Sequence, residues 1–114
     1  MNKRIFYRFN LALDVRYRIL ESLKPYEMTA TQDMCESGIR INLPEQIEPE
    51  TRLELTIKIP GETRPLMAIG RVVWVKKDAL ESNFATGIHL VYIKEKDRQR
   101  FYKYAVLQEN RLRR

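Results

Sequence analysis

Cysteine and histidine are nearly absent from this sequence, which has one of each among 114 residues, Cys35 and His89. A single cysteine excludes an intrachain disulfide and a zinc site built from cysteines. A single histidine leaves no histidine pair for catalysis or metal binding, and the rest of the chain offers no nucleophile with a partner base. We therefore expect a protein that is not an enzyme, has no metal site and needs no cofactor.

Long apolar runs are missing as well. No segment approaches the roughly 18 apolar residues of a membrane span, and residues 1–8 lack the apolar centre of a signal peptide. We expect a cytoplasmic protein without a membrane span. Hydrophobic residues nevertheless make up 44% of the chain, which argues against disorder, and the length fits one domain.

Acidic residues are fewer than basic ones, 15 against 21, giving a net charge of +6. Such a balance favours anionic partners such as nucleic acid, nucleotides or acidic membrane surfaces. Nucleic acid is disfavoured, because the clearest strands do not show exposed aromatic residues interleaved with Lys or Arg. The excess charge gathers at the two ends of the chain.

Alternating apolar and polar residues predict about six short strands. The clearest run, Leu53 to Ile59, ends at the turn signal Pro60-Gly61. Trp74 could stack on a base, but it falls on an apolar strand, where we expect it to fill the core. The other candidate strands lie within residues 11–19, 28–32, 39–43, 67–75 and 88–92. In the last of these, Ile88, Leu90 and Tyr92 form the apolar phase and His89 lies on the polar phase. This spacing favours an antiparallel barrel or sandwich.

The C-terminal segment has a different pattern. Residues 94–114 contain neither glycine nor proline, and Phe101, Ala105, Gln108 and Leu112 recur at helical spacing. We expect an amphipathic helix whose narrow apolar stripe packs on the strands.

Two polar motifs are candidates for ligand binding. Arg4 and Arg8 form an R-x-x-x-R pattern, and a guanidinium can bind a phosphate bidentately or the O6 and N7 atoms of guanine. Asp33 offers a carboxylate to the N1 and N2 hydrogens of guanine, and Gly38 allows close approach of the backbone. Taken singly, the first motif also fits an ordinary basic terminus, and the second fits a polar turn.

Together, the R-x-x-x-R arm and the D-x-C-x-x-G motif before an I-x-I strand resemble the PilZ domain family. The resemblance implies a mainly β fold, a split barrel of six antiparallel strands over residues 11–93. A flexible ligand-binding arm, residues 1–10, would precede it, and an α-helix, residues 94–114, would follow. It also implies a receptor for cyclic di-GMP (c-di-GMP) in which Arg4 and Arg8 hold guanine edges and phosphates, Asp33 holds a guanine and Gly38 shapes the loop.

Cys35 stands where the family usually has serine. A thiol is a weak hydrogen-bond donor, and losing a bond to a charged phosphate costs about 1.5–3 kcal/mol. Cys35 is therefore either a weakened ligand contact or a small packed apolar residue. Lys3 is a third cation beside the arm and would permit a stacked pair of ligands, whereas Arg40 points either into the site or into solvent.

The function implied by the resemblance is a c-di-GMP sensor. Ligand binding would order the N-terminal arm and pass the signal to a separate effector protein, with links to motility or biofilm control. The alternative, which Cys35 favours, is a degenerate PilZ-like adaptor that binds protein and binds the nucleotide weakly or not at all.

Overall fold

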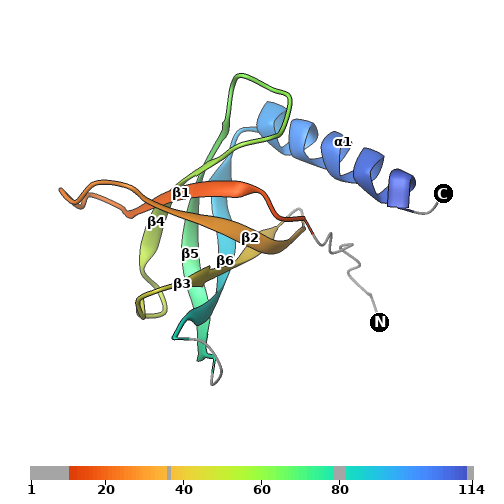
Figure 1. Ribbon diagram of the computed structural model, residues 1–114. Helices are drawn as coiled ribbons and strands as arrows, with labels where there is room; N and C mark the ends of the chain where they lie inside the picture. Colours follow the sequence, from red (N-terminus) through yellow and green to blue (C-terminus); the bar gives the residue numbers. More distant parts are fainter. Residues whose placement is uncertain (1–10, 36, 79–81, 113–114) are drawn as a thin grey trace, which may run out of the picture.

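The computed structural model describes residues 11–35, 37–78 and 82–112. Six antiparallel strands close into a barrel in the order β1-β2-β3-β6-β5-β4, and a helix follows the last strand (Figure 1). The expected antiparallel barrel of six strands with a C-terminal helix is confirmed. The elements are β1 (Asp14–Ile19), β2 (Glu27–Cys35), β3 (Gly38–Leu43), β4 (Arg52–Ile57), β5 (Leu66–Lys77), β6 (Phe84–Ile93) and α1 (Glu95–Leu112).

The barrel interior is filled by the apolar phase of each alternating strand, because successive side chains of a strand point to opposite faces. The clearest sequence run shows this well, since its four apolar residues are all buried. The largest fully buried side chains are Tyr17, Met34, Ile39, Ile41, Leu43, Leu53, Leu55, Ile57, Ile59 and Leu66.

Helix α1 leaves the end of β6 and lies beside one end of the barrel (Figure 1). Phe101 and Ala105 are buried against the core, as the helical spacing predicts. Glu95 and Asp97 lie in the first turn, where the helix dipole favours negative charge. In the described part of the chain, no helix is long and apolar enough to cross a membrane.

Among the described residues, three β-bulges interrupt the barrel and decide which side chains face outward. In each, the register shifts because one strand holds an extra residue: Gln32 in β2, Val73 in β5 and Val91 in β6. An extra residue reverses the in–out alternation beyond it, so a side chain that would point inward points outward instead.

Candidate functional site

The candidate site is a row of four residues that crosses four adjacent strands on the outer wall of the barrel. Asp33 of β2 pairs with Arg40 of β3, Arg40 pairs with Gly87 of β6, and Gly87 pairs with Trp74 of β5. Residues paired in this way lie side by side on one face of a sheet. We call these four residues the transverse row. They bring together a carboxylate, a guanidinium and an indole.

Asp33 belongs to the row because of the bulge at Gln32. Thr31 pairs with Ile41, which faces the interior, whereas Asp33 pairs with Arg40. Without the extra residue, Asp33 would share the inward face of Thr31. The structure also extends β2 to Cys35, beyond the run expected from the sequence, so Asp33 lies within a strand and is held by its ladder.

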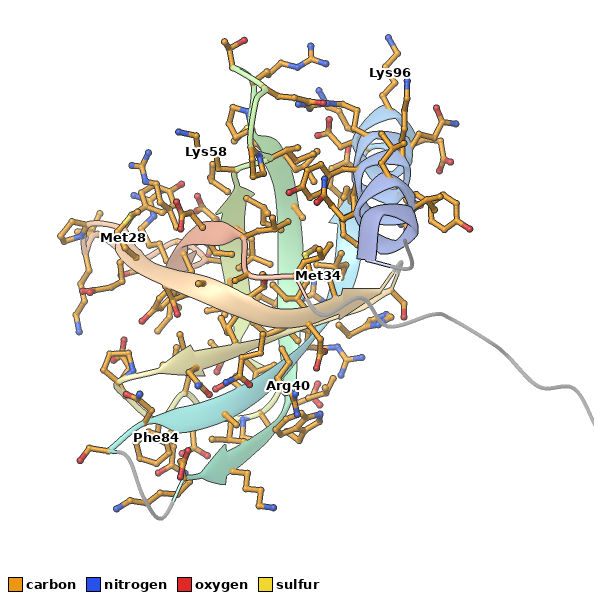
Figure 2. The ribbon with its side chains drawn as sticks, turned by 45° about the vertical axis from the view of Figure 1, so that its right-hand side comes forward. Met28, Met34, Arg40, Lys58, Phe84 and Lys96 are labelled. Carbon is orange, nitrogen blue, oxygen red and sulfur yellow. The ribbon has the colours of Figure 1, made fainter. Side chains whose placement is uncertain are left out.

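Asp33 and Arg40 form an ion pair, with 2.7 Å between Arg40 Nη2 and Asp33 Oδ2. The Asp33 side chain is only 7% exposed, whereas that of Arg40 is 42% exposed. A carboxylate buried to this degree is costly unless a cation compensates it. Arg40 therefore points along the outer wall toward Asp33 (its position is labelled in Figure 2).

The Arg40 side chain is still accessible to a ligand, because 42% of its surface is exposed. Its Nε atom is buried and has no hydrogen-bond partner among the residues that the structure describes, so the ligand would meet the exposed part of the side chain instead. A carboxylate accepts up to four hydrogen bonds, so Asp33 can serve Arg40 and a further donor together. The pair combines one donor and one acceptor at the same place on the wall.

Trp74 lies over Gly87, and the expectation that it fills the core is wrong. It is 42% exposed, because the bulge at Val73 turns it to the outer face. A Cβ atom on Gly87 would lie 2.1 Å from Nε1 of Trp74 and 2.2 Å from its Cε2. Only glycine leaves room for the indole at this position.

A second row lies next to the transverse row on the same face. Cys35 pairs with Gly38, Gly38 with His89, and His89 with Arg71. His89 is exposed, as its place on the polar phase of its strand predicts. Arg71 is held by Glu50, with 3.2 Å between Nη1 and Oε2. This row adds cationic and polar groups beside the indole.

Gly38 is required by close approach between strands. A Cβ atom there would lie 2.6 Å from the backbone oxygen of Ile88, so a larger residue would push β3 away from β6. Ser37 fixes the same corner, because its carbonyl accepts a hydrogen bond from the Leu90 amide at 2.8 Å. The glycine therefore permits the close approach of β3 and β6 at the end of the β2–β3 hairpin, and its role toward a ligand stays a prediction.

For the remaining predicted ligand residues, the structure describes at most the backbone. Lys3, Arg4 and Arg8 lie outside the described residues, so their contacts stay a prediction. For Cys35 the structure gives the backbone, at the end of β2 and opposite Gly38. The role of its thiol also stays a prediction.

The structure adds two residues to the site that sequence reasoning left out of it, Trp74 and Gly87. A signal for them was present, since glycine in a strand interior often marks close approach of another group. The pairing of Gly87 with Trp74 could not be read from the sequence, because it depends on the bulge between them.

The structure is thus a closed barrel with charged and aromatic groups arrayed on its outer wall. The PilZ domain family model matches residues 2–106, and the chain belongs to this family of c-di-GMP receptors. None of the curated proteins compared with the chain matches it.

Two solved structures show the same fold. The Bacillus subtilis inhibitor of motility MotI/DgrA has a TM-score of 0.83 and 20% identity over 100% of this chain. This chain spans 55% of the length of that protein. The PilZ domain of YcgR from Escherichia coli, solved with c-di-GMP, has a TM-score of 0.71 and 8% identity, covering 98% of this chain and 95% of that one.

Proposed function

We propose that this protein is a c-di-GMP sensor that binds the dinucleotide on the transverse row and signals to a partner protein. The observation that carries the proposal is the alignment of the Asp33–Arg40 ion pair with Trp74 over Gly87. Each group matches one part of a guanine nucleotide. A carboxylate accepts from the guanine N1 and N2 hydrogens, a guanidinium binds phosphate or the guanine O6 and N7 edge, and an indole stacks on a base.

The N-terminal arm supplies the remaining charge in this proposal. c-di-GMP is a dianion, and Arg4 and Arg8 would neutralise its phosphates while Lys3 adds a third cation. Placement of the arm against the wall on binding is the change that a partner would detect. Because one structural neighbour is an inhibitor of motility, the motility machinery is the first class of partner that we propose to test.

Calorimetric titration of the full chain with c-di-GMP tests the nucleotide half of the proposal. We expect low-micromolar or tighter binding, and a loss of at least tenfold in Asp33→Asn and in Arg8→Ala, since each removes a charged hydrogen bond worth about 1.5–3 kcal/mol. Arg64→Ala is the matched control, because Arg64 is an exposed arginine in the loop between β4 and β5 and lies off the row. No binding to the intact chain, or equal losses in the control, would contradict the proposal.

A degenerate adaptor is the second candidate, and Cys35 is the observation that favours it. The substitution Cys35→Ser separates the two. If the natural chain binds c-di-GMP and serine changes the affinity less than threefold, the thiol is no obstacle and the sensor is supported. If only Cys35→Ser binds, the natural chain has lost the ligand and acts as an adaptor.

A further inference from the structure

A groove of about 570 Å³ lies on the outer wall away from the transverse row. Its floor is formed by outward-facing residues of β4, β5 and β6, among them Thr56, Met67, Ile69 and Tyr92. The loop before β5 and the start of α1 form one side, and Tyr26 contributes to the other. We call it the β5 groove.

The β5 groove contains large apolar side chains that are exposed and do not belong to the buried core of the barrel. Met67 is 60% exposed and Tyr92 is 56% exposed. Tyr92 was expected to alternate inward with Ile88 and Leu90, but the bulge at Val91 turns it outward. Apolar groups gathered in a concavity, unlike apolar residues scattered over a surface, indicate a binding site.

The acidic groups of the groove are already occupied. Glu54 accepts hydrogen bonds from the Tyr26 hydroxyl at 2.7 Å and from Arg18 at 3.0 Å. The Tyr26 hydroxyl and the Arg18 guanidinium together hold the pKa of the Glu54 carboxyl below its usual value. Asp97 accepts from Arg100 at 2.9 Å. Neither carboxylate is left to attract a cation.

The basic groups on the rim have no such partners. Arg64, Lys94 and Lys96 are exposed, and none of them forms an ion pair within the described residues. Figure 2 shows Lys96 at the end of the barrel opposite Phe84. The unpaired charge around the apolar floor is therefore positive, and the complementary occupant carries acidic groups beside an apolar one.

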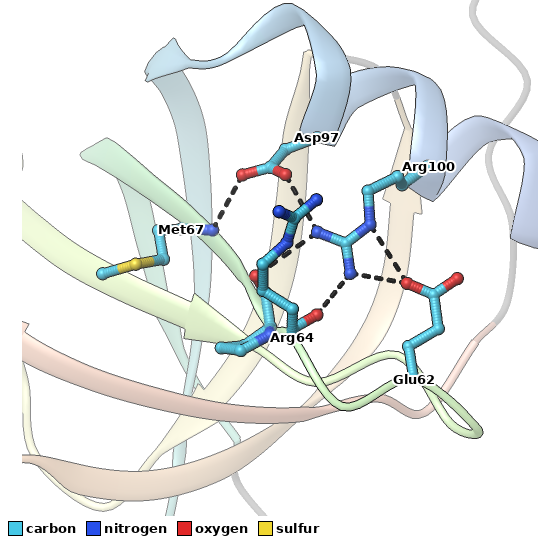
Figure 3. Close-up of polar contacts among 6 residues, drawn as sticks. Glu62, Arg64, Met67, Asp97 and Arg100 are labelled. Carbon is cyan, nitrogen blue, oxygen red and sulfur yellow. Dashed lines mark hydrogen bonds and ion pairs between the residues drawn. The ribbon is translucent and has the colours of Figure 1, made fainter.

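The wall of the groove is held in place by one arginine (Figure 3). Arg100 donates to Glu62, to the Arg64 carbonyl and to Asp97, and Asp97 also accepts from the Met67 amide at 3.4 Å. These bonds connect the loop that carries Arg64 to α1, and connect α1 to the start of β5. A surface fixed in this way loses little conformational entropy when a ligand binds.

We propose that the β5 groove docks a short acidic segment of a partner protein, with one large apolar side chain inserted between Met67 and Tyr92. The concave shape favours an inserted side chain over a flat bilayer, and the three unpaired cations favour Asp and Glu on both sides of it. This assignment builds on the partner half of the proposed function and does not require c-di-GMP to bind.

The test is a selection of linear twelve-residue peptides from a random displayed library on the full, nucleotide-free protein. We expect enriched peptides with a Phe, Trp or Leu anchor flanked by Asp or Glu, and micromolar binding that weakens as salt is raised. Amide chemical shifts of the labelled protein should change around Met67 and Tyr92. Because no nucleotide is present, this result is independent of the titration with c-di-GMP.

Matched variants make the result specific. Met67→Glu should weaken the selected peptide at least tenfold, whereas Met28→Glu, which changes a 65% exposed methionine on β2, should not. The double variant Lys94→Glu, Lys96→Glu should also weaken the selected peptide at least tenfold, whereas the control Lys76→Glu should not. No enrichment, enriched peptides without acidic residues, or equal effects of Met67→Glu and Met28→Glu would overturn the proposal. So would a Met67-dependent dimer in sedimentation, or Met67-dependent binding to anionic phosphatidylserine vesicles.

Discussion

The packing of Trp74 over Gly87 gives the sharpest test of the transverse row. In Gly87→Ala the new methyl group would lie 2.1 Å from Nε1, 2.2 Å from Cε2 and 2.7 Å from Cδ1 of Trp74. All three separations are far below ordinary van der Waals contact, so the indole has to move by more than about 1 Å. Trp74 is 42% exposed and free to swing toward solvent. The strands themselves need not separate.

The variant should therefore keep its fold and lose ligand. Alanine in a strand is favoured over glycine by roughly 0.5–1 kcal/mol, which offsets part of the strain, so we expect the free energy of unfolding to change by less than about 1 kcal/mol. Stacking of a base on an aromatic side chain contributes about 1–3 kcal/mol. Its loss would weaken c-di-GMP binding by roughly five- to a hundredfold.

Two measurements follow the change. Trp74 is the sole tryptophan of the chain, so its emission reports this position alone and should shift to longer wavelength in Gly87→Ala without ligand. Calorimetry then gives the affinity for c-di-GMP. In a Trp74→Ala background, Gly87→Ala should have no further effect on affinity, because the methyl group no longer displaces a ring.

The reasoning is refuted by either of two results. Unchanged emission in Gly87→Ala would mean that the indole does not lie over Gly87. An equal loss of affinity with and without Trp74 would mean that the substitution acts through the strands.

Two further predictions concern stability. Burial raises the pKa of Tyr17 to about 12, against about 10 in the unfolded chain. The stability that neutral Tyr17 contributes is therefore complete below pH 10, falls by about 1 kcal/mol by pH 11 and is lost near pH 12. Urea unfolding at pH 9 and pH 11 should show a smaller loss of stability in Tyr17→Phe than in the natural chain, and an equal loss would contradict this. Arg100→Met should cost about 2 kcal/mol by removing charged hydrogen bonds to Asp97 and Glu62. Lys103→Met, which changes an exposed residue of the same helix, should cost less than about 0.5 kcal/mol. Similar urea midpoints for the two variants would count against the role of Arg100.

The strands and the helix could be predicted because their signals are local. Period-two alternation predicted the strand from Leu53 to Ile59, and its four apolar residues are buried as expected. Helical spacing predicted the C-terminal helix, and Phe101 and Ala105 are buried as expected. The closed barrel followed from the family resemblance. The order of the strands was not predicted, since pairing between distant segments leaves no trace in a single sequence. Asp33 and Gly38 were proposed from a motif, and the structure gives each a definite position, while their roles toward a ligand stay predictions.

The errors come from the bulges. Trp74 and Tyr92 were expected to face inward because an unbroken alternation places them there, and both face outward beyond an extra residue. A bulge depends on how one strand pairs with its neighbour, and that neighbour is distant in the sequence. Arg40 was left open for the same reason, and its ion pair with Asp33 appears only once the register of β2 and β3 is known.

The bulges make the surface chemistry of this barrel depend on how many residues a strand contains as well as on which residues they are. Deleting Val73 would leave every motif residue in place and turn Trp74 toward the interior, while deleting Gln32 would do the same to Asp33. Two related chains could thus match at every motif position, differ by one residue in strand length, and present different outer walls. For this fold, counting residues between motifs is as informative about ligand binding as reading the motifs themselves.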